Sequence, residues 1–159
     1  MKKILPVFLL IISFNISAQV ELKGVQLLTK DSRKKIKTTV GGIKGIIALR
    51  KNNNDTVYGI SFIPTEDGII AGRVYETEIN ILKKGLEKKF DIKFNKEYTS
   101  NFAGSNYNLI AKKDDVIFTI TVNNNPYEDP PNKIGLFIYN TVFLKKVRKE
   151  IKEDALKDF

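Results

Sequence analysis

Alternating apolar and polar residues predict several β-strands, the clearest of them over 116–122. There Val116, Phe118 and Ile120 alternate with residues that include two threonines, a pattern typical of an antiparallel strand with one buried and one solvated face. Similar runs predict strands over 21–29, 46–49, 56–63, 92–94, 107–111 and 134–139. The short polar residues 52–55 favour a hairpin turn between two of these runs, and Pro64 is expected to end the second run.

Two stretches repeat apolar residues at helical spacing instead. Over 75–90 the apolar positions fall at i, i+4, i+7, i+11 and i+15, namely at Tyr75, Ile79, Leu82, Leu86 and Phe90. Over 141–157 a narrower stripe consists of Leu144, Val147, Ile151 and Ala155. Gly85 lies inside the first pattern, and because glycine costs about 1 kcal/mol in a helix, we expect the helix to approach the sheet closely there.

The order of these elements predicts the fold class α+β. We expect a mostly antiparallel sheet of about five to six strands, with two amphipathic helices packed on one face. No internal repeat and no low-complexity linker divides residues 19–159, so this stretch is expected to form a single domain. The side chain of Phe118 should then lie in the core.

Residues 1–18 have the order of a cleavable secretory signal. Lys2 and Lys3 precede an apolar run from Ile4 to Phe14, and small residues end the segment before Gln19. The apolar run is too short to remain as a membrane-spanning helix, so no transmembrane span is expected after cleavage. The sequence therefore predicts a periplasmic or secreted protein.

The sequence contains no cysteine and no histidine, and these absences exclude several kinds of chemistry. Without cysteine there is no disulfide, no thiol nucleophile and no lipid-attachment site after the signal. Without histidine there is no Ser-His-Asp triad and no imidazole ligand for a metal. We therefore assign no catalytic residue, no cofactor and no metal ligand from the sequence.

The chain is basic, with a formal charge of +9 that falls to +7 when Lys2 and Lys3 are removed, because 25 Lys and Arg then face 18 Asp and Glu. A basic segment follows the first predicted strand and contains Lys30, Arg33, Lys34, Lys35 and Lys37. We expect a solvated turn here, with an anion-binding patch as the alternative. A nucleic-acid partner is not expected, because nucleic acid is scarce outside the cytoplasm. The glycines at 41, 42 and 45 match no phosphate-binding loop and are expected to mark a bend or bulge where a strand begins.

Acidic residues occur as the neighbours Glu66-Asp67, Asp114-Asp115 and Glu128-Asp129. A glycosidase needs two carboxyl groups on opposite sides of the scissile bond, about 5–5.5 Å or 6.5–9.5 Å apart. Neighbouring residues in a turn do not provide that arrangement. We interpret all three pairs as loop residues.

The best candidate for a contact site is the proline-rich loop 123–132, with Tyr127, Glu128, Asp129 and Asn132 as its contact residues. A tyrosine offers an amphipathic ring, and the flanking prolines reduce the ordering cost of binding. Two alternatives remain open: a calcium site formed by Asn124, Glu128, Asp129 and Asn132, and a basic amphipathic helix over 145–152 that lies on an anionic membrane.

Several segments resemble small exported proteins of the Bacteroidota, a largely uncharacterised group. The likeness rests on the signal end 15–19, on Leu86-Glu87-Lys88-Lys89-Phe90 before a meander, and on the run 134–140 before a basic tail. It implies an exported α+β domain and no functional residue. Asp55-Thr56-Val57 is similar to the O-glycosylation site of that group, which would place Thr56 on an exposed turn.

Together these features predict an exported, non-enzymatic domain that binds a protein, a peptide or an envelope component. Its contact surface would be the loop 123–132 or the solvated face of the sheet. One alternative function is a histidine-free glycan hydrolase that uses two carboxylates, and another is an inhibitor or immunity-type protein.

Overall fold

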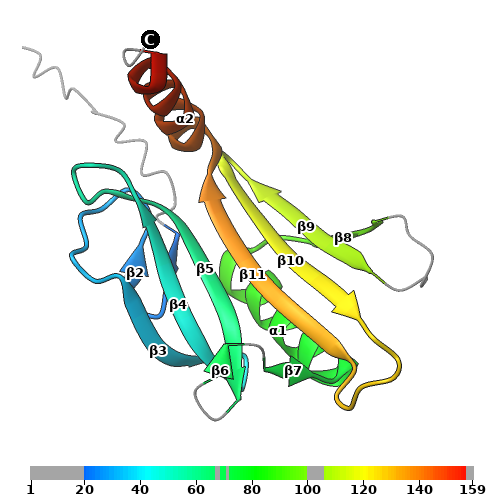
Figure 1. The fold of residues 1–159 in the computed structure, drawn as a ribbon. Coiled ribbons are helices and arrows are strands. Elements are labelled where there is room, and N and C mark those ends of the chain that lie inside the picture. Colours follow the sequence, from blue (N-terminus) through cyan, green and yellow to red (C-terminus); the bar gives the residue numbers. More distant parts are fainter. Residues whose placement is uncertain (1–19, 67–68, 71, 100–105, 157–159) are drawn as a thin grey trace, which may run out of the picture.

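One large antiparallel sheet organises the protein in its computed structural model, which describes residues 20–66, 69–70, 72–99 and 106–156 (Figure 1). Within these residues the sheet has nine strands: β3 (Lys35–Val40), β4 (Ile43–Lys51), β5 (Val57–Glu66), β6 (Ile69–Ile70), β7 (Arg73–Val74), β8 (Asn95–Tyr98), β9 (Tyr107–Lys113), β10 (Val116–Asn124) and β11 (Asn132–Asn140). The main path runs β3-β4-β5-β11-β10-β9-β8, while β6 pairs with β5 and β7 pairs with β11. A separate small sheet pairs β1 (Glu21–Leu22) with β2 (Val25–Gln26).

The predicted class is confirmed, since the fold is a mostly antiparallel sheet with two helices. The predicted number of strands was too low, because β3, β6 and β7 did not stand out in the sequence. The strand predicted over 92–94 is absent there, and the structure instead has β8 over Asn95–Tyr98. The hairpin predicted around residues 52–55 is present as β4 and β5, which pair in antiparallel register. β5 continues past Pro64 to Glu66, so the proline does not end this strand.

The first strand of the large sheet lies one segment later than predicted, and it is an edge strand. Residues 21–29 form only the short β1 and β2, whereas the basic segment predicted as a turn contributes β3. In β3 the apolar residues Ile36 and Val40 face the core, while Lys35 and Lys37 point to solvent. Two apolar residues among lysines and threonines are thus sufficient for an edge strand, because one face and one backbone edge of such a strand are in contact with water.

The glycines at 41 and 42 form a hairpin turn rather than a bulge. They connect β3 to β4, and both have positive φ, +59° for Gly41 and +85° for Gly42. Positive φ at both central positions is the requirement of a type I′ turn, and glycine meets it at little steric cost. The irregularity in β4 lies between Arg50 and Lys51, at the other end of the strand.

Helix α1 (Glu76–Phe90) covers one face of the sheet and builds the core with it. Its predicted apolar residues from Ile79 to Phe90 are buried, and the ring of Phe90 lies 5.0 Å from that of Phe118 in β10. Phe118 is fully buried, as predicted. Tyr75 is the exception in this stripe, since it precedes the first turn as the N-cap residue and is 48% exposed.

Gly85 does not mark a close approach between helix and sheet. A methyl group built on its Cα would meet no atom within 4 Å. The glycine therefore keeps its intrinsic cost in the helix without a packing benefit.

We expect the substitution Gly85→Ala to raise the free energy of unfolding by about 1 kcal/mol, because alanine loses less backbone entropy in a helix. Urea denaturation measures the difference. The exposed Lys84→Ala variant, also in α1, is the control and should change stability by less than about 0.5 kcal/mol. A destabilised Gly85→Ala variant would contradict the open environment of this glycine.

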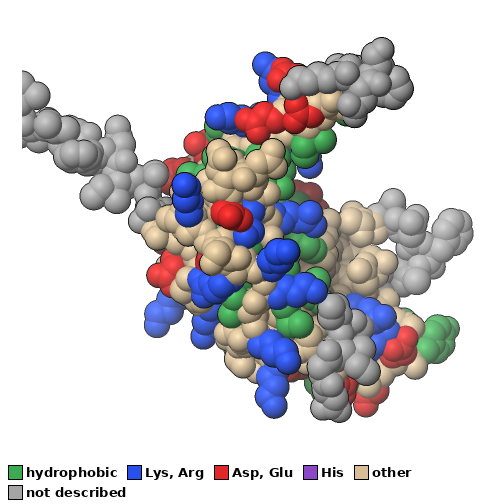
Figure 2. All heavy atoms as spheres, turned by 60° about the vertical axis from the view of Figure 1, so that its left-hand side comes forward, with side chains coloured by type: hydrophobic (Ala, Val, Ile, Leu, Met, Phe, Trp, Pro, Cys, Tyr) green, Lys and Arg blue, Asp and Glu red, His purple; other side chains and the backbone are tan. Residues whose placement is uncertain are grey.

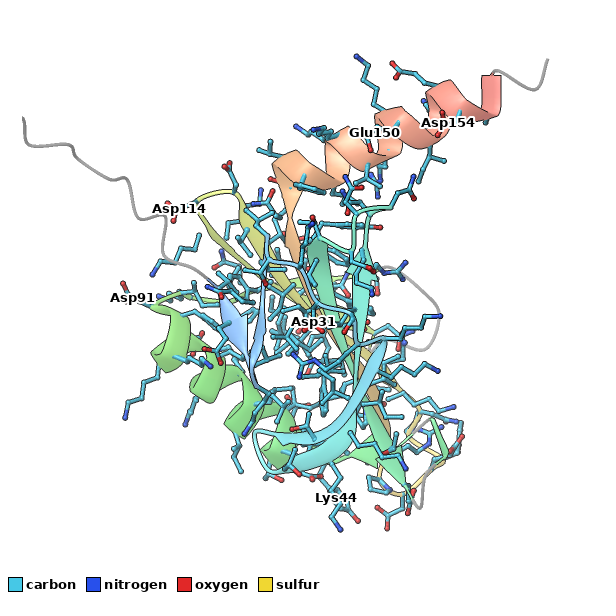
Figure 3. All side chains as sticks on the ribbon, turned by 90° about the vertical axis from the view of Figure 1, so that its left-hand side faces the viewer. Asp31, Lys44, Asp91, Asp114, Glu150 and Asp154 are labelled. Atoms are coloured by element: carbon cyan, nitrogen blue, oxygen red, sulfur yellow. The ribbon has the colours of Figure 1, made fainter. Side chains whose placement is uncertain are left out.

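Helix α2 (Thr141–Leu156) follows β11 directly, and the Asn140 side-chain oxygen accepts a 2.8 Å hydrogen bond from the backbone N–H of Phe143. Only its first turns contact the sheet region, through the buried Val147 and through Phe143, whose ring stacks on Tyr58 at 6.1 Å. Farther along, Ile151 is 62% exposed. The predicted packing of this second helix on the same sheet face is therefore not confirmed, and Figure 3 shows α2 leaving the end of the sheet and leaning away from α1.

Neither helix resembles a membrane span. Within the described ranges, no helix combines the length and the apolar character that a bilayer crossing requires.

Candidate functional site

The loop between β10 and β11 has a defined shape that its own polar groups maintain. The N–H of Asn125 donates to the carbonyl oxygen of Pro131 at 2.9 Å, which closes the base of the loop. The side-chain oxygen of Asn125 accepts the N–H of Tyr127 at 3.2 Å, and its amide nitrogen donates to Glu128 at 3.0 Å. The loop is therefore ordered before any partner arrives, which lowers the entropic cost of binding.

Arg73, in the short strand β7, ties this loop to the sheet. Its guanidinium donates to the carbonyl oxygen of Pro131 at 2.9 Å and forms an ion pair with Glu128. The Arg73 side chain is only 12% exposed, so this ion pair is partly shielded from water. Glu128, predicted as a contact residue, thus also anchors the loop.

Asn132 lies beneath the loop rather than on its surface. The residue is 2% exposed, and its side-chain oxygen accepts a 2.8 Å hydrogen bond from the amide of Asn124. It therefore supports the loop from inside and cannot present its amide to a partner. The same contacts disfavour the calcium alternative, because the oxygens of Asn132 and Glu128 already bind protein groups.

In contrast to Asn132, Tyr127 is almost fully exposed, with 95% of its surface accessible at the tip of the loop. Two residues later, the carboxylate of Asp129 lies near the phenol of Tyr75, and its hydrogen-bonding and charge interactions raise the pKa of Tyr75. Asp129 thus lies beside the start of α1, and Glu128 connects the loop to β7.

A third exposed tyrosine, Tyr98, lies at this end of the molecule and packs against Tyr107. The phenol of Tyr107 is buried and donates to both carboxylate oxygens of Glu76 at 3.0 Å; burial and then this hydrogen bond raise its pKa. Its ring lies 6.4 Å from the ring of Tyr98, which is 70% exposed. Lys96 lies over both rings, with its ammonium nitrogen 3.7 Å from the Tyr107 centroid and 4.9 Å from the Tyr98 centroid.

Tyr75, Tyr98 and Tyr127 together form what we call the tyrosine end. They come from the N-cap of α1, from the edge strand β8 and from the loop after β10. Among the described residues these are the tyrosines with large exposed surfaces, at 48%, 70% and 95%. The sequence pointed to Tyr127 but not to the other two, because Tyr75 is brought to this end by the pairing of β7 with β11, and Tyr98 by the pairing of β8 with β9.

Two aromatic rings partly cover the centre of the sheet face that α1 leaves free. The ring of Tyr139 lies over Gly59, where an added methyl group would come within 2.6 Å of it. Phe137 covers Gly135 in the same way, and the two rings stack at 6.2 Å. These half-buried rings fill the space above two glycines.

The described acidic pairs do not converge on a cavity. Asp114 and Asp115 form the turn between β9 and β10, Glu128 pairs with Arg73, and Asp129 lies near Tyr75. Asp67 lies outside the described residues. Within the described part of the chain, no group of three or more acidic side chains could hold a metal ion.

Comparison with known proteins adds no relative. No family model matches the chain, and neither a curated protein nor a solved structure matches it. Function therefore has to be inferred from the described surfaces.

Proposed function

We propose that this protein is an exported, non-enzymatic binding domain that contacts a protein or peptide partner through its tyrosine end. The observation that supports this most is the grouping of Tyr75, Tyr98 and Tyr127, three exposed aromatic side chains from distant parts of the chain. Tyrosine combines a large apolar contact area with a polar tip and has few rotatable bonds, so it is enriched among residues that dominate binding energy.

The surroundings of these rings favour a preformed binding surface. Tyr75 lies beside Asp129, Tyr98 lies against Tyr107 and Lys96, and the backbone beneath Tyr127 is fixed by Asn125. A partner would therefore meet rings and loop atoms that are already positioned, and less free energy is lost to ordering on binding.

A carboxylate-dependent glycan hydrolase has less support. Such an enzyme needs two carboxyl groups that face each other across a cleft. The hollow between β1 and α1, about 330 Å³ in volume, has Glu21 as its one acidic lining residue, and the hollow on β3 and β4 has none. An inhibitor or immunity-type protein would use the same tyrosine end, so it is a special case of the proposal. Export to the periplasm or the medium remains part of it.

The proposal predicts site-specific cross-linking to a partner. We would place a photo-activatable phenylalanine analogue at position 127 and irradiate the protein in the envelope fraction of its native host. We expect one discrete cross-linked protein or peptide, identified by mass spectrometry, because the ring at position 127 is 95% exposed on the predicted contact surface.

The matched control carries the same analogue at position 81. Ile81 is 59% exposed and lies on α1, outside the loop 123–132 and the three tyrosines. Equal cross-linking from both positions would show non-specific contact, and absence of any adduct from position 127 in both envelope and medium would refute the proposal. Tyr98→Ala should reduce the adduct from position 127, because it removes a second contact at the same surface.

A further inference from the structure

A second surface, formed by β3 and β4, carries an unusual concentration of positive charge. Residues 33–51 include seven Lys and Arg and no Asp or Glu. The sequence predicted a solvated turn in the first part of this segment, with an anion-binding patch as the alternative. Because the segment folds into two adjacent strands, its charges are instead brought together.

The register of the two strands assigns most of these charges to one face. Ile36 and Val40 of β3 and Ile43 and Ile47 of β4 point toward the core. Lys35, Lys37, Lys44 and Arg50 therefore point to the opposite face, and all four are exposed. Figure 2 shows blue Lys and Arg side chains gathered over this side of the molecule, with few red side chains between them.

Within the described residues, no ion pair neutralises the charges on this face. Asp31 pairs with Arg33 and Asp55 pairs with Lys51, so both of these acidic residues are occupied by cations at the margin of the segment. Glu66, at the end of the neighbouring strand β5, forms no ion pair with the described lysines and arginines. Among the described residues, no carboxylate lies within ion-pair distance of Lys35, Lys37, Lys44 or Arg50. Four unpaired cations on one sheet face produce a local positive potential that attracts anions.

A shallow hollow of about 390 Å³ lies among these side chains. It is lined by Lys37, Thr38, Thr39, Lys44, Gly45, Ile46 and Thr65. The hollow thus offers ammonium groups for anions, threonine hydroxyls for hydrogen bonds and one aliphatic side chain for an apolar surface. Hydroxyl-rich rings that carry acidic groups present the complementary set of atoms.

We propose that this outer face of β3 and β4 binds an acidic polysaccharide. Single-stranded nucleic acid is less suitable, because its binding depends on exposed aromatic faces and none of the large exposed apolar residues lies on these two strands. The same absence argues against a lipid bilayer, which would need apolar side chains that insert beside the lysines. This inference does not depend on the proposed function, since the tyrosine end uses other residues.

The test measures the affinity of the purified protein for a fluorescein-labelled oligogalacturonate by fluorescence anisotropy. We expect binding that weakens steeply as NaCl is raised, and no binding to a neutral malto-oligosaccharide of equal length. The double variant Lys37→Gln/Lys44→Gln should bind oligogalacturonate roughly tenfold more weakly, as expected for the loss of two exposed charge contacts.

The matched control is Lys84→Gln/Lys88→Gln, which removes two exposed lysines from α1 and the same net charge. It should change the affinity less than twofold. An equal loss in both double variants, or no binding to oligogalacturonate at low salt, would overturn the proposal. Tighter binding to oligothymidine or to phosphatidylglycerol vesicles would also overturn it, in favour of nucleic acid or membrane. The cross-link from position 127 should persist in Lys37→Gln/Lys44→Gln, which separates the two proposals.

Discussion

Replacing Phe118 by alanine is expected to lower the free energy of unfolding by roughly 3–5 kcal/mol. The ring is fully buried, lies 5.0 Å from the ring of Phe90 in α1, and is flanked by Ala111 in β9 and Ile138 in β11. Its removal deletes apolar contacts with the helix and leaves a cavity that paired strands cannot close. A loss of this size is a large share of the about 5–15 kcal/mol that stabilises a typical domain.

Urea denaturation followed by circular dichroism measures the loss. Tyr127→Ala is the control, because it removes an aromatic ring of similar size that is 95% exposed, and it should change stability by no more than about 0.5 kcal/mol. Should Phe118→Ala cost less than about 1 kcal/mol, the contact between α1 and the centre of the sheet would be wrong.

The parts of the fold that the sequence predicted correctly are those with a strong local pattern. β10 alternates over its whole length, and α1 repeats its apolar residues at helical spacing over four turns. Both patterns arise because one face of each element is buried. β8, by contrast, is exposed at each of its four residues and has no such alternation, so nothing local distinguishes Asn95–Tyr98 from a loop.

The second helix shows the limit of the same method. A stripe from Leu144 to Ala155 predicts that one face is covered, but only Val147 in this stripe is fully buried. The pattern indicates an amphipathic helix and does not say what covers it. Here β11 ends just before α2 begins, so the helix extends past the sheet and only its first turns can contact it.

The candidate surfaces were predictable only where one segment supplies the whole feature. Tyr127 lies between prolines in a single loop, and this context is visible in the sequence. Tyr75 and Tyr98 join it only through the pairings of β7 with β11 and of β8 with β9. The basic face likewise depends on register, because a shift of β3 by one residue would send Lys35 and Lys37 to the core side.

Gly45→Ala provides the sharpest test of how closely β4 and β5 pack. A methyl group at this position would lie 2.4 Å from a ring carbon of Phe62 and 2.5 Å from the carbonyl oxygen of Ile63. The Phe62 ring is fully buried and the Ile63 oxygen belongs to the backbone of the paired strand, so neither can move away freely. We expect a loss of about 1–3 kcal/mol in the free energy of unfolding, the range typical of overpacking.

The comparison with Gly85→Ala distinguishes this steric cost from a general effect of the substitution. Both variants add one methyl group and both restrict the unfolded chain, which on its own favours the folded state by about 0.4–1 kcal/mol. The two should nevertheless change stability in opposite directions, because position 85 has open space within 4 Å and position 45 has none. Two stabilising substitutions would mean that β4 and β5 are farther apart at Gly45 than their hydrogen-bonded register requires, and the hollow beside Lys37 and Lys44 would then differ in shape as well.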